Sequence, residues 1–135
     1  MNDQCRYLFI YGTLLNKQNV FASYLKENST FFAKGKLRGL LYDIGSYPGV
    51  LLNPSGDTFV YGSIVYMNNP VTVLEKLDYY EGIGDLYPEP HEYVRALVDI
   101  ETEKGIINCW VYLYNWPFDR HRQIVSGDYM AYIKN

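Results

Sequence analysis

The residue best suited to acid–base chemistry is Glu81, at the end of the helix that the sequence predicts over residues 71–81. Asn69 is a favourable N-cap, and Pro70 occupies the first helical position, where its missing N–H costs no hydrogen bond. Gly82 is typical of the residue that follows a helix, because it adopts the left-handed conformation easily. The sequence therefore predicts a carboxylate in the last turn of a short helix.

The helical phase of Glu81 is unusual for a charged side chain. With successive residues about 100° apart, it falls within the arc of the helix's apolar side chains, Val73, Leu74, Leu77 and Tyr80. A carboxylate there loses hydration and lies at the negative end of the helix dipole, and both effects raise its pKa. A carboxylate with a raised pKa suits a general base near neutral pH. Two alternatives stay open: the helix end frays and Glu81 points to water, or Glu81 forms a buried ion pair with Arg95.

The second candidate is the turn Tyr11–Leu14, which follows a short apolar strand predicted over residues 5–11. Gly12 allows the backbone to take a positive φ and allows another group to approach closely. A turn of this kind can direct several backbone N–H groups at one anion or polarised carbonyl. The alternative is a tight turn that only ends the strand.

Short strands and helices must bring these two segments together. A helix is predicted over residues 19–26 and a last turn or helix over 129–133. Strands are predicted over residues 31–44, 50–52, 58–67, 93–101 and 106–114. Two glycines, Gly35 and Gly39, suggest that the segment 31–44 is a bent or bulged strand pair.

These elements predict one domain over residues 1–135, of the α+β class. The expected architecture is a small mixed β-barrel of about six or seven strands with two or three short helices. The connection 82–92 contains two prolines and several acidic residues, which predicts an exposed loop that can act as a lid.

Composition narrows the classes of function. A net charge of −3 without a basic run argues against nucleic acid and anionic membranes as partners. There is no apolar stretch of about 18 residues to span a membrane. Residues 1–6 lack a basic segment followed by an apolar one, so we expect a cytoplasmic protein with Cys5 and Cys109 reduced. With two histidines and no zinc or nucleotide motif, the sequence predicts neither a metal nor a cofactor, and it leaves the oligomeric state open.

Several stretches, in order along the chain, resemble the γ-glutamylcyclotransferase-like (AIG2-like) family. Tyr11–Leu14 is similar to its Tyr-Gly-Ser/Thr-Leu loop, and Leu77–Gly82 with Tyr93–Arg95 is similar to its Leu-Asp-x-x-Glu-Gly … Tyr-x-Arg block. Weaker similarities lie at residues 39–49, 60–66 and 126–129. One departure is Ser63, which stands where many members carry Glu; that position is not the family's catalytic one.

The resemblance implies an enzyme of the lyase or acyltransferase type that needs no cofactor. The substrate is a small γ-glutamyl amide whose α-amine attacks its own γ-carbonyl, giving 5-oxoproline and releasing an amine or amino acid. Glu81 would be the catalytic base and acid. The substrate-binding residues would be Tyr11, Gly12, Thr13 and Leu14, with Tyr93, Arg95 and Tyr112 as secondary candidates for lining the pocket.

Two other functions would use the same scaffold. One is a non-catalytic module that binds a small carboxylate, since a fold does not fix a function. The other is removal of a γ-glutamyl protecting group from a secondary metabolite. No motif specifies the leaving group, which we expect to be set by the loop 82–92, the wall at Tyr47–Gly49 and the C-terminal aromatic residues.

Overall fold

The computed structural model describes residues 5–12, 14 and 19–134, which form seven strands and three helices. In chain order these are β1 (Tyr7–Ile10), α1 (Val20–Glu27), β2 (Ser29–Asp43), β3 (Pro48–Leu52), β4 (Phe59–Met67), α2 (Pro70–Tyr80), β5 (Tyr93–Thr102), β6 (Gly105–Tyr114), β7 (Arg122–Gln123) and α3 (Tyr129–Ile133). Five strands close in the order β2-β4-β1-β6-β5, because β5 pairs back to β2 at Lys36 and Glu101. The strands β3 and β7 pair with β2 outside this ring. The predicted small α+β barrel is confirmed.

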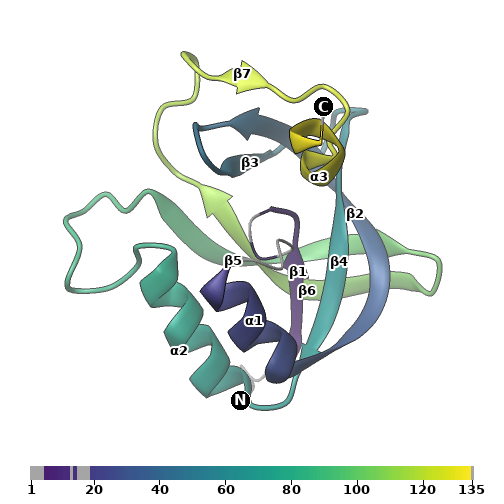
Figure 1. Ribbon diagram of the computed structural model, residues 1–135. Helices are drawn as coiled ribbons and strands as arrows, with labels where there is room; N and C mark the ends of the chain where they lie inside the picture. Colours follow the sequence, from purple (N-terminus) through teal and green to yellow (C-terminus); the bar gives the residue numbers. More distant parts are fainter. Residues whose placement is uncertain (1–4, 13, 15–18, 135) are drawn as a thin grey trace.

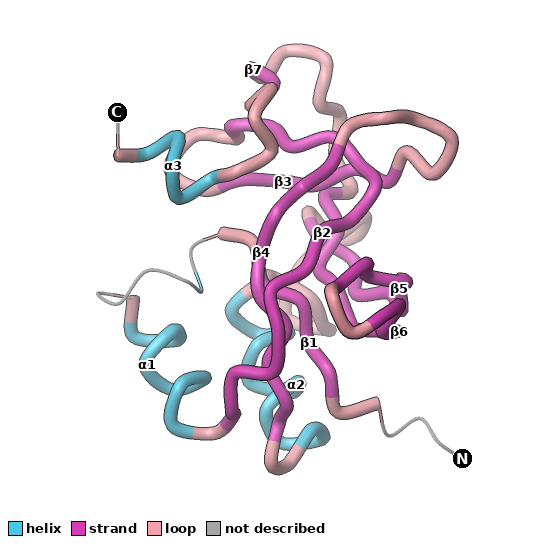
Figure 2. Tube along the Cα trace, turned by 90° about the vertical axis from the view of Figure 1, so that its right-hand side faces the viewer, coloured by secondary structure: helices cyan, strands magenta, loops and turns pink. Residues whose placement is uncertain are grey.

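The helices divide between two ends of the barrel. In Figure 1, α1 and α2 lie side by side next to the barrel. Figure 2 shows both helices at one end, with α3, β3 and β7 at the other. The long strands β2 and β4 connect the two ends (Figure 2). The end of α2 and the end of β1 therefore come near one another in space, although the sequence separates them widely.

Strand β1 is buried on both faces, which explains its continuous apolar sequence. Leu8 and Ile10 pack in a cluster that also contains side chains of α1 and α2. Phe9 and Tyr11 point the other way, into a cluster that contains side chains from all five strands of the barrel. The first strand is thus held between the barrel interior and the helices, and the turn that follows it starts from a rigid base.

The segment 29–43 is one fifteen-residue strand, so the expected strand pair is wrong, although the strand has an irregularity in its pairing as predicted. The irregularity in its pairing with β4 falls between Phe31 and Ala33. Gly35 has another role, because a Cβ atom there would lie 2.6 Å from Cγ2 of Ile100 on β5. This glycine lets β5 approach β2 where the barrel closes.

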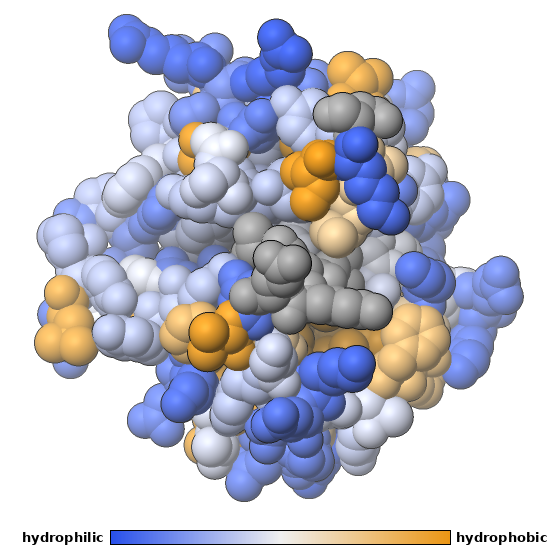
Figure 3. Space-filling model, viewed as in Figure 1, coloured by the Kyte–Doolittle hydropathy of each residue, from blue (hydrophilic) through white to orange (hydrophobic). Residues whose placement is uncertain are grey.

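Nearly all of the buried apolar side chains belong to these two clusters. On the face seen in Figure 3, hydrophobic side chains form small groups between hydrophilic ones. Within the described residues, no helix combines the length and the apolar character that crossing a membrane requires.

Candidate active site

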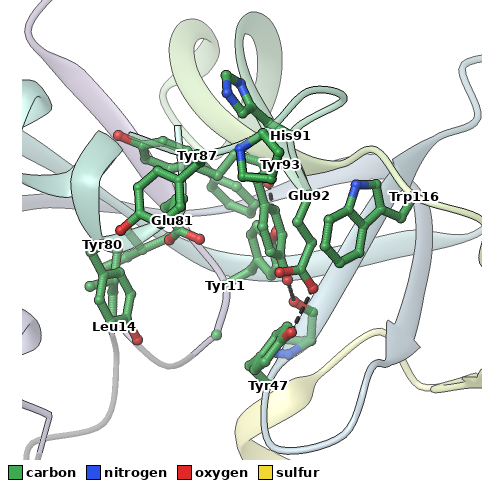
Figure 4. Close-up of a pocket in the computed structure, with 17 residues that line it drawn as sticks. Tyr11, Leu14, Tyr47, Tyr80, Glu81, Tyr87, His91, Glu92, Tyr93 and Trp116 are labelled. Atoms are coloured by element: carbon green, nitrogen blue, oxygen red, sulfur yellow. Dashed lines mark hydrogen bonds between the residues drawn. The ribbon is translucent and has the colours of Figure 1, made fainter. Parts of the chain in front are cut away.

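A cavity of about 430 Å³ lies where the turn after β1, the end of α2 and the loop before β5 meet. Its lining is largely aromatic and contains two carboxylates: Phe9, Ile10, Tyr11, Gly12, Leu14, Tyr47, Pro48, Tyr80, Glu81, Gly82, Tyr87, Pro88, His91, Glu92, Tyr93, Tyr112 and Trp116. Figure 4 shows Glu81 and Glu92 reaching the cavity from opposite sides, with Tyr11 between them. Both candidate segments predicted from the sequence therefore line one cavity.

The end of α2 is fixed by backbone hydrogen bonds, so the alternative in which it frays is wrong. Gly82 has a φ of +79°, as a glycine after a helix does. Its N–H donates to the carbonyl of Tyr79 at 3.2 Å, and the N–H of Ile83 donates to the carbonyl of Asp78 at 2.9 Å. These two bonds form a Schellman motif with Glu81 as the C-cap residue. Glu81 is held at the cavity wall by the backbone that ends the helix.

The carboxyl of Glu81 has the electrostatic character that the sequence predicts. Burial raises its pKa from 4.5 to about 8, and the charges of Glu92 and Asp78 add to the effect. The side chain forms no hydrogen bond or ion pair with any other described residue, and it lines the cavity. A carboxyl that is protonated below about pH 8 and ionised above it can exchange protons with a ligand near neutral pH.

Arg95 is not the partner of Glu81, so the alternative of a buried ion pair between them is wrong. Its Nε and Nη2 atoms donate to the two carboxylate oxygens of Asp78 at 2.8 and 3.1 Å. The guanidinium also lies over the ring of Trp110, 4.3 Å from its centroid. Arg95 is not among the described residues that line the cavity, in contrast to the sequence-based expectation. Arg95 instead orients the carboxylate of Asp78 on α2.

The turn after β1 lines the cavity, but its glycine has a different role from the one expected. The φ of Gly12 does not lie in the left-handed region, so that part of the prediction is wrong. The predicted close approach is confirmed, since a Cβ atom at Gly12 would lie 2.5 Å from Cγ of Pro48. Leu14 is buried and lines the cavity. Thr13, also predicted to bind substrate, lies outside the described residues.

Three buried tyrosines form much of the wall, and their hydroxyl groups are already occupied. Tyr11 donates to the carbonyl of Tyr112 at 2.6 Å. Tyr93 donates to the carbonyl of Pro48 at 2.5 Å, and Tyr112 donates to Asp78 Oδ1 at 2.7 Å. Burial raises the pKa of all three, so they remain neutral. Tyr93 and Tyr112 therefore line the cavity as predicted, and their hydroxyls join its walls to one another.

The sequence did not single out several residues of the opposite wall. Glu92 lies at the end of the predicted lid loop, and its Oε2 accepts a hydrogen bond from the hydroxyl of Tyr47 at 2.5 Å. His91 and Trp116 also line the cavity, and Tyr87 lines it on the side of Glu81 (Figure 4). The available signal was the run of acidic and aromatic residues in and after the loop 82–92, which predicts a surface but no particular contact. Among the described residues, no group of three His, Cys, Asp or Glu side chains could hold a metal ion.

Comparison with known proteins gives one consistent result. The family model described as "Gamma-glutamyl cyclotransferase, AIG2-like" matches residues 8–131. The γ-glutamylcyclotransferase family protein YtfP of Escherichia coli is 31% identical and is matched over 91% of this chain and 95% of its own length. Its solution structure has a TM-score of 0.67 at 28% identity, covering 94% of this chain and 98% of that one.

Two further solved structures share the fold at lower identity. YkqA of Bacillus subtilis has a TM-score of 0.70 at 24% identity, covering 96% of this chain and 43% of that one. An AIG2-like protein of mouse has a TM-score of 0.67 at 21% identity, covering 84% of this chain and 80% of that one. At these identities the likeness concerns the fold alone.

Proposed function

This chain belongs to the γ-glutamyl cyclotransferase, AIG2-like family, and on that premise we propose that it is an enzyme that cleaves a γ-glutamyl amide. The observation that carries the proposal is the carboxyl of Glu81. It lines the same cavity as the turn after β1, and its pKa is raised to about 8. A site that only binds a small carboxylate would gain nothing from the carboxyl of Glu81 beside that ligand. A proton-transfer reaction, in contrast, requires a group that can accept and donate a proton.

The reaction transfers protons from the α-ammonium nitrogen, which loses two, to the leaving nitrogen, which gains two when the amine is released as an ammonium ion. Ionised Glu81 takes a proton from the α-ammonium group, and the free amine attacks the γ-carbonyl carbon to form a five-membered ring. The C–N bond to the leaving group then breaks as Glu81 returns that proton to the departing nitrogen, and the second proton of the attacking nitrogen passes through solvent to the released amine. The products are 5-oxoproline and an amine or amino acid, and Glu81 ends in its original state. Because the nucleophile is tethered to the electrophile, holding the glutamyl chain folded supplies much of the acceleration.

The turn after β1 suits the carbonyl oxygen or the carboxylate of the glutamyl group. The backbone N–H of Gly12 donates to no other described residue, and Gly12 lines the cavity. Charge develops on the carbonyl oxygen as the ring forms, and a fixed N–H donor stabilises it. The contact between Gly12 and Pro48 leaves no room for a side chain at this position.

The test is the release of 5-oxoproline from a panel of γ-glutamyl amino acids, γ-glutamyl amines and ε-(γ-glutamyl)lysine. We expect the Glu81→Gln variant to lose about 10²- to 10⁴-fold in kcat while it stays folded, as the loss of a general acid–base group predicts. Glu75→Gln is a matched control, since Glu75 is an exposed residue of the same helix. Wild-type rates in Glu81→Gln would refute the assigned role. Calorimetric binding without product across the panel would favour the non-catalytic binding module.

A further inference from the structure

A second carboxylate faces the cavity from the side opposite Glu81. Glu92 shares that side with Tyr47 and Trp116 (Figure 4). Its Oε2 atom accepts the hydroxyl of Tyr47, and no described Lys, Arg or His forms an ion pair with it. A half-buried carboxylate without a cation has lost hydration that only the hydroxyl replaces. A positively charged group in the cavity would offset that loss.

The backbone on either side of Glu92 is held in place. The N–H of Asn115 donates to the carbonyl of Glu92 at 2.7 Å, and the Asn115 side chain donates to the carbonyl of His91 at 3.0 Å. The indole N–H of Trp116 donates to the carbonyl of Pro90 at 2.9 Å. Three consecutive residues are thus tied to the segment after β6. A carboxylate fixed in this way is pre-organised to bind a ligand.

The surroundings of Glu92 suit a cation. Tyr47 and Trp116 line the cavity beside Glu92 (Figure 4), and the faces of aromatic rings attract ammonium groups. The cavity's described lining contains two carboxylates and one basic side chain, His91, whose Nε2 lies 3.1 Å from the carbonyl of Gly84. A ligand with an added positive charge matches this wall, and one with an added carboxylate opposes it.

We propose that Glu92 is a specificity-determining residue that binds an ammonium group on the leaving amine. Among γ-glutamyl amides whose leaving amines are of equal length, the protein then prefers those that end in an ammonium group. This inference rests on the proposed function, because it needs the α-amine of the glutamyl group beside Glu81 and its carbonyl at the turn after β1. Those two positions occupy one side of the cavity, so the leaving group extends towards the side of Glu92 and Tyr47 (Figure 4).

Three amides that differ in one terminal group test the proposal. They are the γ-glutamyl amides of diaminobutane, pentylamine and aminobutyrate, which end in an ammonium, a methyl and a carboxylate group. We expect kcat/KM for the diaminobutane amide to exceed that for the pentylamine amide by about tenfold, as a charge-assisted hydrogen bond predicts. In Glu92→Gln the ratio should fall to about one. The ratio is the readout, because loss of the Glu92 charge also lowers the pKa of Glu81 and changes the rates on both amides together.

Two variants refine the test. Tyr47→Phe removes the hydroxyl that orients the carboxylate, so we expect it to lower the ratio in part. Glu89→Gln makes the same change of charge at an exposed position of the same loop, outside the cavity lining, and should leave the ratio unchanged. A wild-type ratio near one, or a ratio that Glu92→Gln does not alter, overturns the proposal. An equal loss on all three amides also overturns it, because Glu92 would then bind the glutamyl ammonium.

Binding measurements separate this proposal from the proposed function. The corresponding glutaryl amides lack the α-amine and cannot cyclise, so calorimetry reports only their affinity. We expect the wild-type protein to bind the glutaryl amide of diaminobutane about tenfold more tightly than that of pentylamine, and Glu92→Gln to remove the difference. That result without any 5-oxoproline from the γ-glutamyl amides would refute the reaction and retain the cation site. Turnover without a cation preference would do the reverse.

Discussion

Asp78 and Glu81 lie one turn apart at the end of α2, and the fold treats their carboxylates in opposite ways. Asp78 accepts two hydrogen bonds from Arg95, at 2.8 and 3.1 Å, and one from the hydroxyl of Tyr112 at 2.7 Å. Glu81 accepts none from any described residue, and its pKa is raised to about 8. Both lie at the negative end of the helix dipole, which disfavours a negative charge. Arg95 compensates one carboxylate and leaves the other free to exchange a proton.

The difference separates a residue that stabilises the fold from one that costs stability. A carboxylate paired with a guanidinium and a hydroxyl holds α2 against β5 and β6. A carboxylate that is buried without a partner destabilises the folded state whenever it is ionised. Residues of the second kind persist where their chemistry is needed, and they are expected at functional sites.

The largest expected effect is on the pH dependence of stability. The pKa of Glu81 is about 8 in the folded protein and 4.5 in the unfolded chain. Between these pH values the folded state therefore holds a proton that the unfolded state has lost. The free energy of unfolding of the wild type should therefore fall as the pH rises from about 5 to 8. In Glu81→Gln this loss disappears, and the variant should be more stable than the wild type by roughly 2–4 kcal/mol above about pH 8.

Urea denaturation of both proteins at about pH 5, 7 and 8.5 measures this difference. Near pH 5 the two should be alike, because Glu81 is protonated in the folded state. Glu75→Gln, an exposed change in the same helix, serves as the control for a lost carboxylate. A difference between wild type and Glu81→Gln that stays constant with pH would show that Glu81 is hydrated in the folded protein.

Removing the carboxylate of Asp78 should lower the free energy of unfolding, whereas removing that of Glu81 should raise it. Asp78→Asn leaves the guanidinium of Arg95, whose side chain is 24% exposed, without its anion. We expect a loss of about 2 kcal/mol in the free energy of unfolding at pH 7, between the values for exposed and buried pairs. Asp85→Asn changes the same charge at an exposed position and should have little effect. Equal stabilities for the two variants would mean that the pair with Arg95 contributes nothing.

A smaller loss is expected at the third member of this group. Tyr112→Phe removes the hydroxyl that donates to Asp78 and keeps the ring in the wall of the cavity. The expected cost is about 1 kcal/mol, the typical contribution of one hydrogen bond. In the double variant Tyr112→Phe with Asp78→Asn, the loss in the free energy of unfolding should be smaller than the sum of the two single losses, because both changes remove the same contact. Strict additivity would show that the hydroxyl acts through some other neighbour.

The sequence predicted the position of Glu81 but not that Arg95 pairs with Asp78. Helical phase placed Glu81 on the apolar face of its helix, and Gly82 marked where the helix ends, because both follow from local rules. The partner of Arg95 could not be predicted in the same way. Asp78 and Glu81 are three residues apart in one helix, and the choice between them depends on how α2 lies against β5.

The glycines show the same limit. Gly82 follows a helix and has the positive φ that its position predicts. Gly12 and Gly35 instead make room for Pro48 and Ile100, which are distant in the sequence. Glycine is compatible with a turn, a bend and a close approach alike, so its presence in a strand does not identify which of these occurs. The long β2 was expected to be two strands for this reason.

The smallest expected effect tests whether the two carboxylates influence one another. The charge of Asp78 raises the pKa of Glu81, after burial and the charge of Glu92. Asp78→Asn should therefore lower this pKa, and Arg95→Gln should raise it by leaving Asp78 uncompensated. If Glu81 is the general base, the rise of kcat/KM with pH, near pH 8 in the wild type, should move in the same two directions, each by less than about one pH unit.

The profile is measured from about pH 6 to 10 on an amide that the wild type cyclises. Arg38→Gln is the matched control, since Arg38 pairs with Glu101 at the exposed surface and faces neither carboxylate. The α-ammonium group of the substrate also ionises in this range, but its pKa does not depend on Arg95 or Asp78. Opposite shifts in the two variants would therefore identify Glu81 as the titrating group. Profiles that coincide with the wild type would assign the rise to the substrate, and the contrast between the two carboxylates would then concern stability alone.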